Sequence, residues 1–247
     1  MYLYLYAPFL REKKYASPLA LLEGRINDFG IQGKIAQLSQ FLKFPAALKE
    51  FGLKRLSTLV VVGDDSLLEE AVSVANGTPG LVIGYIPMVQ SNYGATLGIP
   101  QGPEAVDILA ARRITKFDLG RIGERCFFGS LKAEGVGLEF HCPTFSVFPK
   151  EYAKLEIVNL GFFLETGEPS SDATDGLLEV SIVPFRGTMF RKAESATHIK
   201  TVSCRLKASK PVTVTCSGLG TLKLPLQVDI IPKAIRMVVG RSKVARK

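Results

Sequence analysis

The residues that could do chemistry are concentrated in one strand-turn-helix pattern in the first third of the chain. The apolar, β-branched run 57–62 predicts a buried strand, and it leads directly into the polar turn 63–65. Ser66 and Glu69 have the spacing of a capping box, so we expect a helix to begin at Ser66. Free backbone N–H groups and the helix dipole at such a start can bind a phosphate group. The pattern indicates a nucleotide-phosphate site, although acid-rich helix starts are also common without a ligand.

A second strand-to-loop transition follows about 20 residues later and strengthens this interpretation. The apolar run 80–86 predicts a strand, and the loop after it carries the polar side chains Gln90 and Asn92. In open α/β sheets, ligands bind at the carboxyl ends of the strands, near helix N-termini. Both loops therefore have the position that a nucleotide site requires.

The elements that must position these loops change in character partway along the chain. Strand and helix patterns alternate in the first half, which predicts a parallel sheet with helices on both faces. The expected strands are 2–6, 34–38, 57–62 and 80–86, and the expected helices are 15–29, 46–51 and 66–76. After about residue 120, short strand patterns separated by turns predict an antiparallel β-sandwich. These strands are 125–130, 137–141, 154–163, 177–184, 199–208, 212–216, 222–224 and 227–231.

Composition limits the class of protein. The 247 residues are 47% hydrophobic, which excludes disorder across the whole chain, and no apolar run approaches the roughly 18 residues of a membrane span. The first residues indicate a strand and not a signal peptide. With four cysteines but no CxxC pair, and only two histidines, we expect reduced thiols, no ordinary zinc site and a cytoplasmic location.

The charge of the chain favours anionic partners. The formal net charge is +8, and basic residues are dense at the C-terminal end: Arg236, Arg241, Lys243, Arg246 and Lys247. This end is either a solvated tail or a segment that contacts an anionic membrane surface, where each basic residue contributes about 1 kcal/mol.

Taken together, the segments 62–69, 87–95, 175–180 and 230–235 resemble the diacylglycerol kinase catalytic family. This family includes bacterial diacylglycerol and phosphatidylglycerol kinases and the sphingosine kinases. The resemblance implies an α/β, Rossmann-like nucleotide-binding domain, 1–120, to which the chain end 232–247 returns. It also implies a β-rich, lipid-binding domain, 121–231.

The resemblance further implies ATP-dependent phosphorylation of a lipid hydroxyl, with ATP and Mg²⁺ as cofactors. The implied partners are a nucleotide and a lipid substrate, and not nucleic acid. The implied nucleotide-binding residues are Ser39, Val62, Gly63, Asp64, Asp65, Ser66, Leu67, Leu68, Glu69, Gln90 and Asn92. The implied Mg²⁺ ligands are Asp175 and the backbone carbonyls of Asp172 and Leu177, which suits a hard cation. An Asp-Gly turn that simply enters a strand would explain Asp175 and Gly176 equally well.

Several positions depart from the family pattern. Val62 and Asp65 replace two motif glycines, and at about 4 Å and an effective dielectric near 20, the Asp65 carboxylate would repel a phosphate by about 4 kcal/mol. Tyr93 replaces an aspartate. Ser217 stands where the family has the carboxylate that accepts the hydroxyl proton, and an ordinary serine is not a general base at neutral pH. The alternatives are therefore a lipid kinase with weakened catalysis, a non-catalytic relative that binds nucleotide or lipid, and an NAD kinase-like enzyme.

Overall fold

A computed structural model of the protein describes residues 1–39, 42–52, 55–161, 172–186, 192–193 and 195–241. Its contacts divide the chain into two units, the first made of Met1–Phe117 with the segment from Ala234 onward, and the second of Asp118–Lys233. Both divisions fall inside strands, β5 (Ile114–Ile122) and β17 (Leu226–Val238), which run from one unit into the other. The domain limits expected from the sequence, near residues 120 and 231, lie in the same two strands.

The first unit is built on a parallel sheet with the strand order β2–β1–β3–β4–β17. The strands before β17 are β1 (Tyr2–Tyr6), β2 (Gly33–Gln37), β3 (Thr58–Gly63) and β4 (Val82–Pro87). The last part of β17 joins them through the parallel pair Met237–Ile83. β3 and β4 are buried along their whole length, as is typical of parallel strands covered on both faces. The predicted parallel sheet is confirmed.

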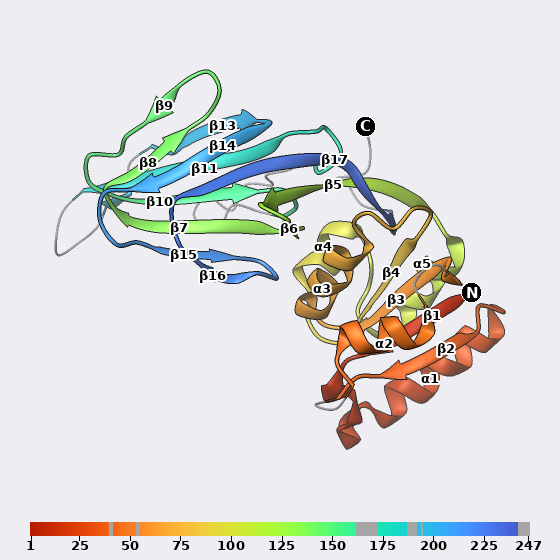
Figure 1. Ribbon diagram of the computed structural model, residues 1–247. Coiled ribbons are helices and arrows are strands. Elements are labelled where there is room, and N and C mark those ends of the chain that lie inside the picture. The colour runs from red at the N-terminus through yellow and green to blue at the C-terminus, as the bar shows by residue number, and fades with distance from the viewer. Residues whose placement is uncertain (40–41, 53–54, 162–171, 187–191, 194, 242–247) are drawn as a thin grey trace. The chain divides into compact units, whose positions relative to one another are not determined.

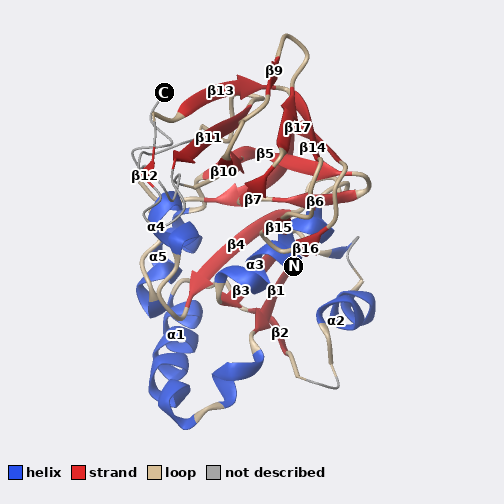
Figure 2. Cartoon of the chain, turned by 90° about the vertical axis from the view of Figure 1, so that its left-hand side faces the viewer, coloured by secondary structure: helices blue, strands red, loops and turns tan. Residues whose placement is uncertain are grey.

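Helices cover both faces of this sheet (Figures 1 and 2). α1 (Ala16–Asp28) and α5 (Ala105–Ala111) pack together on one face, and α2 (Phe44–Phe51) and α3 (Asp65–Ala75) lie on the other. The short helix α4 (Asn92–Leu97) follows β4. This arrangement places the loops after β3 and β4 at the same edge of the sheet.

The second unit is a sandwich of two antiparallel sheets. One sheet contains part of β17 with β14 (Ser203–Ala208), β8 (Leu138–His141), β9 (Ser146–Val147), β5 and β6 (Arg125–Phe127). The other contains β7 (Ser130–Val136), β10 (Tyr152–Val158), β11 (Leu178–Arg186), β12 (Lys192–Ala193), β13 (Thr197–Thr201), β15 (Thr213–Cys216) and β16 (Gly220–Leu222). Buried side chains of both sheets, among them Phe140 and Val180, form one hydrophobic core. The predicted sandwich is confirmed.

Several strand predictions in the second unit were wrong in extent. The predicted strand 125–130 divides between β6 and the start of β7, which belong to different sheets, and the predicted strand 222–224 lies at the end of β16, which stops at Leu222. The predicted strand 199–208 is two strands, β13 and β14, which pair in different sheets because the chain turns at Val202. The Thr201 hydroxyl stabilises that turn by donating to the Ser203 carbonyl oxygen at 2.7 Å. The predicted strand 227–231 continues beyond Pro232 to Val238, because its last part pairs with β4 of the parallel sheet, although Lys233 adopts a positive φ of 52° on the way.

Two expectations fall partly outside the described residues. The predicted strand 154–163 ends at Val158, and residues 162 and 163 are not described. The basic C-terminal end is described only as far as Arg241. Within the described ranges, no helix combines the length and the apolar composition needed to cross a membrane.

Candidate functional site

The turn between β3 and α3 is closed by an aspartate cap. Asp64 has an extended backbone, and its Oδ1 accepts a hydrogen bond of 3.0 Å from the Leu67 N–H. Helix α3 therefore begins at Asp65, so the predicted capping box of Ser66 and Glu69 is wrong. Either residue type makes a good cap, but Asp64 is the residue with non-helical backbone angles, and its short carboxylate reaches the third helical N–H group.

Gly63 is required at the end of β3 by close packing against the end of β1. A Cβ at this position would lie 2.8 Å from the Ala7 Cβ, and Ala7 N donates to the Val62 carbonyl oxygen at 2.9 Å. Val62 and Leu68 have no exposed surface, so their side chains belong to the core and only their backbone atoms are available to a ligand. Ser66 is exposed at the first turn of α3.

Asp65 joins the turn after β3 to the loop after β4. Its Oδ1 accepts hydrogen bonds from the Tyr85 hydroxyl, at 2.9 Å, and from the Ser91 hydroxyl, and its Oδ2 accepts one of 3.0 Å from the Asn92 N–H. The structure thus brings together the two loops that the sequence assigned to one nucleotide site. The carboxylate that replaces a motif glycine is held by three donors of the chain itself.

A second contact, between helices α3 and α4, is buried. The Tyr93 hydroxyl donates to Glu69 Oε1, and both side chains are buried. Tyr93 is the residue that replaces the family's aspartate, so an acid–phenol pair between α3 and α4 occupies this position. The predicted binding residue Glu69 therefore has a partner within the chain.

Ser39 and Gln90, the remaining predicted nucleotide contacts, lie in loops at the ends of β2 and β4. The Ser39 hydroxyl accepts a hydrogen bond of 3.0 Å from the Leu42 N–H. Gln90 is exposed. Of the two, only Gln90 lines the pocket described next.

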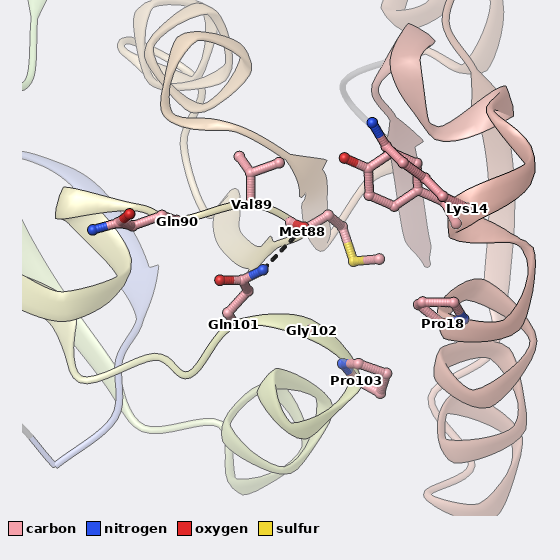
Figure 3. Close-up of a pocket in the computed structure, with 9 residues that line it drawn as sticks. Lys14, Pro18, Met88, Val89, Gln90, Gln101, Gly102 and Pro103 are labelled. Atoms are coloured by element: carbon pink, nitrogen blue, oxygen red, sulfur yellow. Dashed lines mark hydrogen bonds between the residues drawn. The ribbon is translucent and has the colours of Figure 1, made fainter.

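A pocket of about 710 Å³ adjoins the loop after β4 (Figure 3). Its walls come from the residues before and at the start of α1, from the loop after β4 and from residues before α5: Lys14, Tyr15, Pro18, Met88, Val89, Gln90, Gln101, Gly102 and Pro103. Gln101 Nε2 donates to the Met88 carbonyl oxygen at 3.3 Å, and Met88 N donates to the Gly63 carbonyl oxygen at 2.8 Å. One lining residue, Met88, is therefore hydrogen-bonded to the residue that precedes the β3–α3 turn. Its cation, Lys14, forms an exposed ion pair of 2.8 Å with Glu12.

In the second unit, Asp118 is a buried carboxylate that the sequence analysis did not assign. Its Oδ2 accepts from the Gly176 N–H at 2.7 Å, and its Oδ1 accepts from the Lys233 N–H at 2.6 Å. Its side chain is fully buried. An acidic residue inside the otherwise apolar run Phe117–Gly120 was the signal that could have identified it. Asp118 holds the Asp175–Gly176 turn against β17.

The predicted Mg²⁺ ligands lie in that turn and already have partners. Asp175 Oδ1 accepts from the Leu177 N–H at 3.0 Å, and its Oδ2 is 3.3 Å from Lys200 Nζ. Asp172 Oδ1 accepts from the Thr174 N–H at 3.2 Å and from its hydroxyl. Among the residues that the structure describes, no three His, Cys, Asp or Glu side chains are placed to hold a metal ion. The contacts of these two carboxylates favour an internal ion pair between Asp175 and Lys200 over a bound cation. We therefore assign no step to a metal here.

Ser217, in the place of the family's proton acceptor, is bound to the backbone. Its hydroxyl donates to the Ser130 carbonyl oxygen and accepts from the Ser130 N–H, both at 3.1 Å. The hydroxyl thus acts both as donor and as acceptor in linking the end of β15 to the start of β7. This serine is a structural residue and has no partner base in these contacts.

Comparison with known proteins identifies the fold. No protein-family model matches the chain. No curated protein matches it either. A diacylglycerol kinase from Bacillus anthracis str. Sterne is similar in structure, with a TM-score of 0.78, 15% identity, and coverage of 97% of this chain and 96% of that one. The chain therefore has the two-domain fold of diacylglycerol kinases, as the sequence resemblance predicted.

Two further solved structures share the fold more distantly. An NAD kinase from Archaeoglobus fulgidus in complex with ATP has a TM-score of 0.60 at 12% identity, covering 96% of this chain and 93% of that one. Yeast NADH kinase complexed with NADH has a TM-score of 0.59 at 10% identity, covering 99% and 85%. The fold is thus a kinase-type fold, and the diacylglycerol kinase version of it fits this chain better.

Proposed function

We propose that this chain binds a nucleoside triphosphate in its first unit and transfers its terminal phosphoryl group to a lipid hydroxyl slowly. The observation that supports binding is the pocket of about 710 Å³ beside the loop after β4, linked to the β3–α3 turn through Met88 and Gly63. Its size is typical of sites for small molecules and cofactors. It lies at the carboxyl edge of a parallel sheet, where such folds bind nucleotides. A protein with the same fold, the archaeal NAD kinase, has been solved with ATP.

The walls of the pocket suit the two ends of a nucleotide differently. Met88, Pro18 and Pro103 provide apolar surface for a base, and Figure 3 shows the Met88 side chain directed toward Pro18. Lys14 provides positive charge at the margin. We assign the phosphates to the exposed Ser66 hydroxyl and to the first N–H groups of α3. Mg²⁺ would arrive with the nucleotide and reduce the repulsion between the phosphates and Asp65.

Slow transfer follows from the contacts of Ser217. A positioned general base typically accelerates such a step by about 10²–10⁴-fold, and Ser217 uses its hydroxyl to bind the Ser130 backbone. The second candidate function, binding without any transfer, is favoured by this same observation. A lipid acceptor is favoured over a nicotinamide dinucleotide because the diacylglycerol kinase has the higher TM-score.

Two measurements test the proposal. Mg-ATP at about 100 times its dissociation constant should add roughly 2.7 kcal/mol to the free energy of unfolding, which a thermal shift detects. Transfer of labelled γ-phosphate to diacylglycerol in mixed micelles should be slow, and Ser217→Asp should accelerate it. Ser209→Asp, an exposed position on another turn of the same unit, is the matched control and should change nothing.

The outcomes separate the candidates. No thermal shift with Mg-ATP would contradict nucleotide binding. A clear shift without transfer, in both the wild type and Ser217→Asp, would replace the slow kinase by the non-catalytic relative. Transfer to NAD in place of lipid would support the NAD kinase-like alternative.

A further inference from the structure

A lysine contacts the aspartate to which the family resemblance assigns a metal ion. Lys200 lies on β13, directly opposite Glu179 on the neighbouring strand β11. Its Nζ is 2.7 Å from Glu179 Oε1 and 3.3 Å from Asp175 Oδ2, so one ammonium group bridges two carboxylates. Carboxylate oxygens gathered around one positive charge are also the environment that a hard divalent ion prefers.

Glu179 is an acid that needs a positive charge close by. Leu178 and Val180, on either side of it, belong to the hydrophobic core of the sandwich, so the alternation of a strand places Glu179 on the other face of its sheet. Its side chain is nevertheless only 8% exposed. Its Oε2 accepts no hydrogen bond from any residue that the structure describes. A carboxylate with so little access to water is costly unless a cation compensates its charge.

The oxygen atoms implied as Mg²⁺ ligands are used by the chain itself. Asp175 Oδ1 accepts a hydrogen bond of 3.0 Å from the Leu177 N–H, and its Oδ2 faces Lys200 Nζ. The Asp172 carbonyl oxygen accepts one of 3.1 Å from the Asp175 N–H. A divalent ion bound to these oxygens would lie close to the ammonium group, and the two positive charges would repel each other. The residues present therefore fit a lysine and do not fit a resident Mg²⁺ ion.

Lys200 is placed to connect two parts of the second unit. Asp175 lies in the turn before β11, and Glu179 lies on β11 itself, so the ammonium group ties both to β13. An ammonium group has three donors, and the Lys200 side chain is 55% exposed, so water can accept from the donor that the carboxylates leave. Asp118 holds the same turn through the Gly176 N–H. The turn is thus fixed from two directions by side chains of the chain.

We propose that the Lys200 ammonium group is a built-in cation, which takes the place of a metal ion at the Asp175–Gly176 turn and makes the stability of the second unit independent of divalent ions. Removing this one charge leaves the carboxylates of Glu179 and Asp175 without a cation between them. Their oxygens can then coordinate Mg²⁺ or Ca²⁺, at the usual distances of about 2.0–2.6 Å. Lys200→Met therefore creates a divalent-cation site that the natural chain does not use.

Thermal unfolding in the absence of nucleotide and lipid tests the proposal. Each protein is unfolded first in EDTA and then with excess Mg²⁺ or Ca²⁺, and NaCl of equal ionic strength corrects for screening. The Tm of the wild type should be the same in all three solutions. Lys200→Met should have a lower Tm in EDTA, and either divalent ion should raise that Tm by about 2–4 °C. Lys200→Arg keeps the charge, so its Tm should not respond to the ions.

Two further variants show whether the response belongs to this pair of carboxylates. Lys132→Met is the matched control, because Lys132 pairs at 3.5 Å with the buried Glu156 on the same face of the same sheet. Its Tm should not respond to divalent ions. Lys200→Met combined with Glu179→Gln lacks one of the two carboxylates, and it should lose the response that Lys200→Met gains.

Three results would overturn the proposal. One is stabilisation of the wild type by Mg²⁺ or Ca²⁺ that disappears in Asp175→Asn, which would show a resident metal site. Another is a Tm of Lys200→Met that neither ion changes. The last is an equal response of Lys132→Met, which would show a general effect of removing a lysine.

If Lys200→Met is unfolded in EDTA, circular dichroism replaces the Tm as the measurement. Addition of Mg²⁺ or Ca²⁺ should then restore the native spectrum, and the absence of recovery would contradict the proposal. Because neither nucleotide nor acceptor lipid is present, the result does not depend on whether the proposed kinase activity exists.

Discussion

The Asp65 carboxylate accepts a hydrogen bond of 2.9 Å from the Tyr85 hydroxyl and so joins the first residue of α3 to β4. Burial raises the pKa of Tyr85 above its ordinary value, which keeps the phenol protonated and able to donate. The negative side chain at a position where the resembling family has glycine is therefore stabilised by the chain itself. This link makes the β3–α3 turn and the β4–α4 loop a single structural unit.

Asp65→Ala should lower the free energy of unfolding by about 1–3 kcal/mol, because three donors lose a charged acceptor. Tyr85→Phe should cost about 0.5–1.5 kcal/mol. Urea denaturation of both single variants and the double variant measures the coupling. Since the side chains are in contact, the double variant should cost less than the sum of the two, and additivity within about 0.3–0.5 kcal/mol would contradict the link.

Gly63→Ala should destabilise the protein by about 1–3 kcal/mol, because the new methyl group would lie 2.8 Å from the Ala7 Cβ. Gly24→Ala is the matched control, since Gly24 lies within α1 and a Cβ there meets nothing within 4 Å. Helix propensity predicts a gain of about 0.5–1 kcal/mol for this control. Thermal unfolding of both variants checks the pair, and equal effects would show that Gly63 is not packed against β1.

Asp118→Ala should destabilise the protein by about 1–3 kcal/mol, because the N–H groups of Gly176 and Lys233 lose their charged, buried acceptor. The control is Asp107→Ala, which removes an exposed carboxylate paired with Arg25 at 2.6 Å and should cost about 0–1 kcal/mol. Chemical denaturation gives both values. A small effect at Asp118 would mean that the Asp175–Gly176 turn is held in another way.

Cys142 should be the most reactive of the four thiols. Burial acts to raise its pKa, but hydrogen bonds with Thr144 and Phe145 outweigh this and leave the pKa below its ordinary value. Burial raises the pKa of Cys204 to about 12, and Cys126 and Cys216 are also buried. Brief treatment of the folded protein with iodoacetamide should therefore label Cys142 first, as mass spectrometry can show. Labelling that persists in Cys142→Ser at the original rate would contradict this assignment.

Glu179 should make the stability of the protein depend on pH in a defined direction. Burial raises its pKa above the ordinary value of 4.5 despite the opposing effect of Lys200. The folded state therefore binds this proton more tightly than the unfolded state. The contribution of Glu179 to stability falls as pH rises from its unfolded-state pKa through its folded-state pKa. Between about pH 4 and pH 7, the Tm of the wild type should decline relative to that of Glu179→Gln. Glu151→Gln, at an exposed position, serves as the control and should show no such trend.

The local sequence was enough to predict the architecture. The β-branched run of β3 and the apolar run of β4 indicated buried parallel strands, and the loss of helical periodicity after residue 120 indicated the sandwich. Such patterns depend on residues a few positions apart, and the chain displays them without reference to its fold. The resemblance to diacylglycerol kinases rested on short segments in the right order, and the structural comparison confirmed the fold they imply.

Only the tertiary structure decided which side chains serve the fold and which remain free for a ligand. The choice of Asp64 over Ser66 as the cap depends on backbone angles, since both residue types cap helices well. The partners of Asp65 are 20 and more residues away, and those of Asp118 are 58 and 115 residues away. Hydrogen bonds over such separations exist only after the strands have assembled, because folding must first close the intervening loops. Periodicity and spacing therefore located the candidate site, and long-range packing determined its contacts.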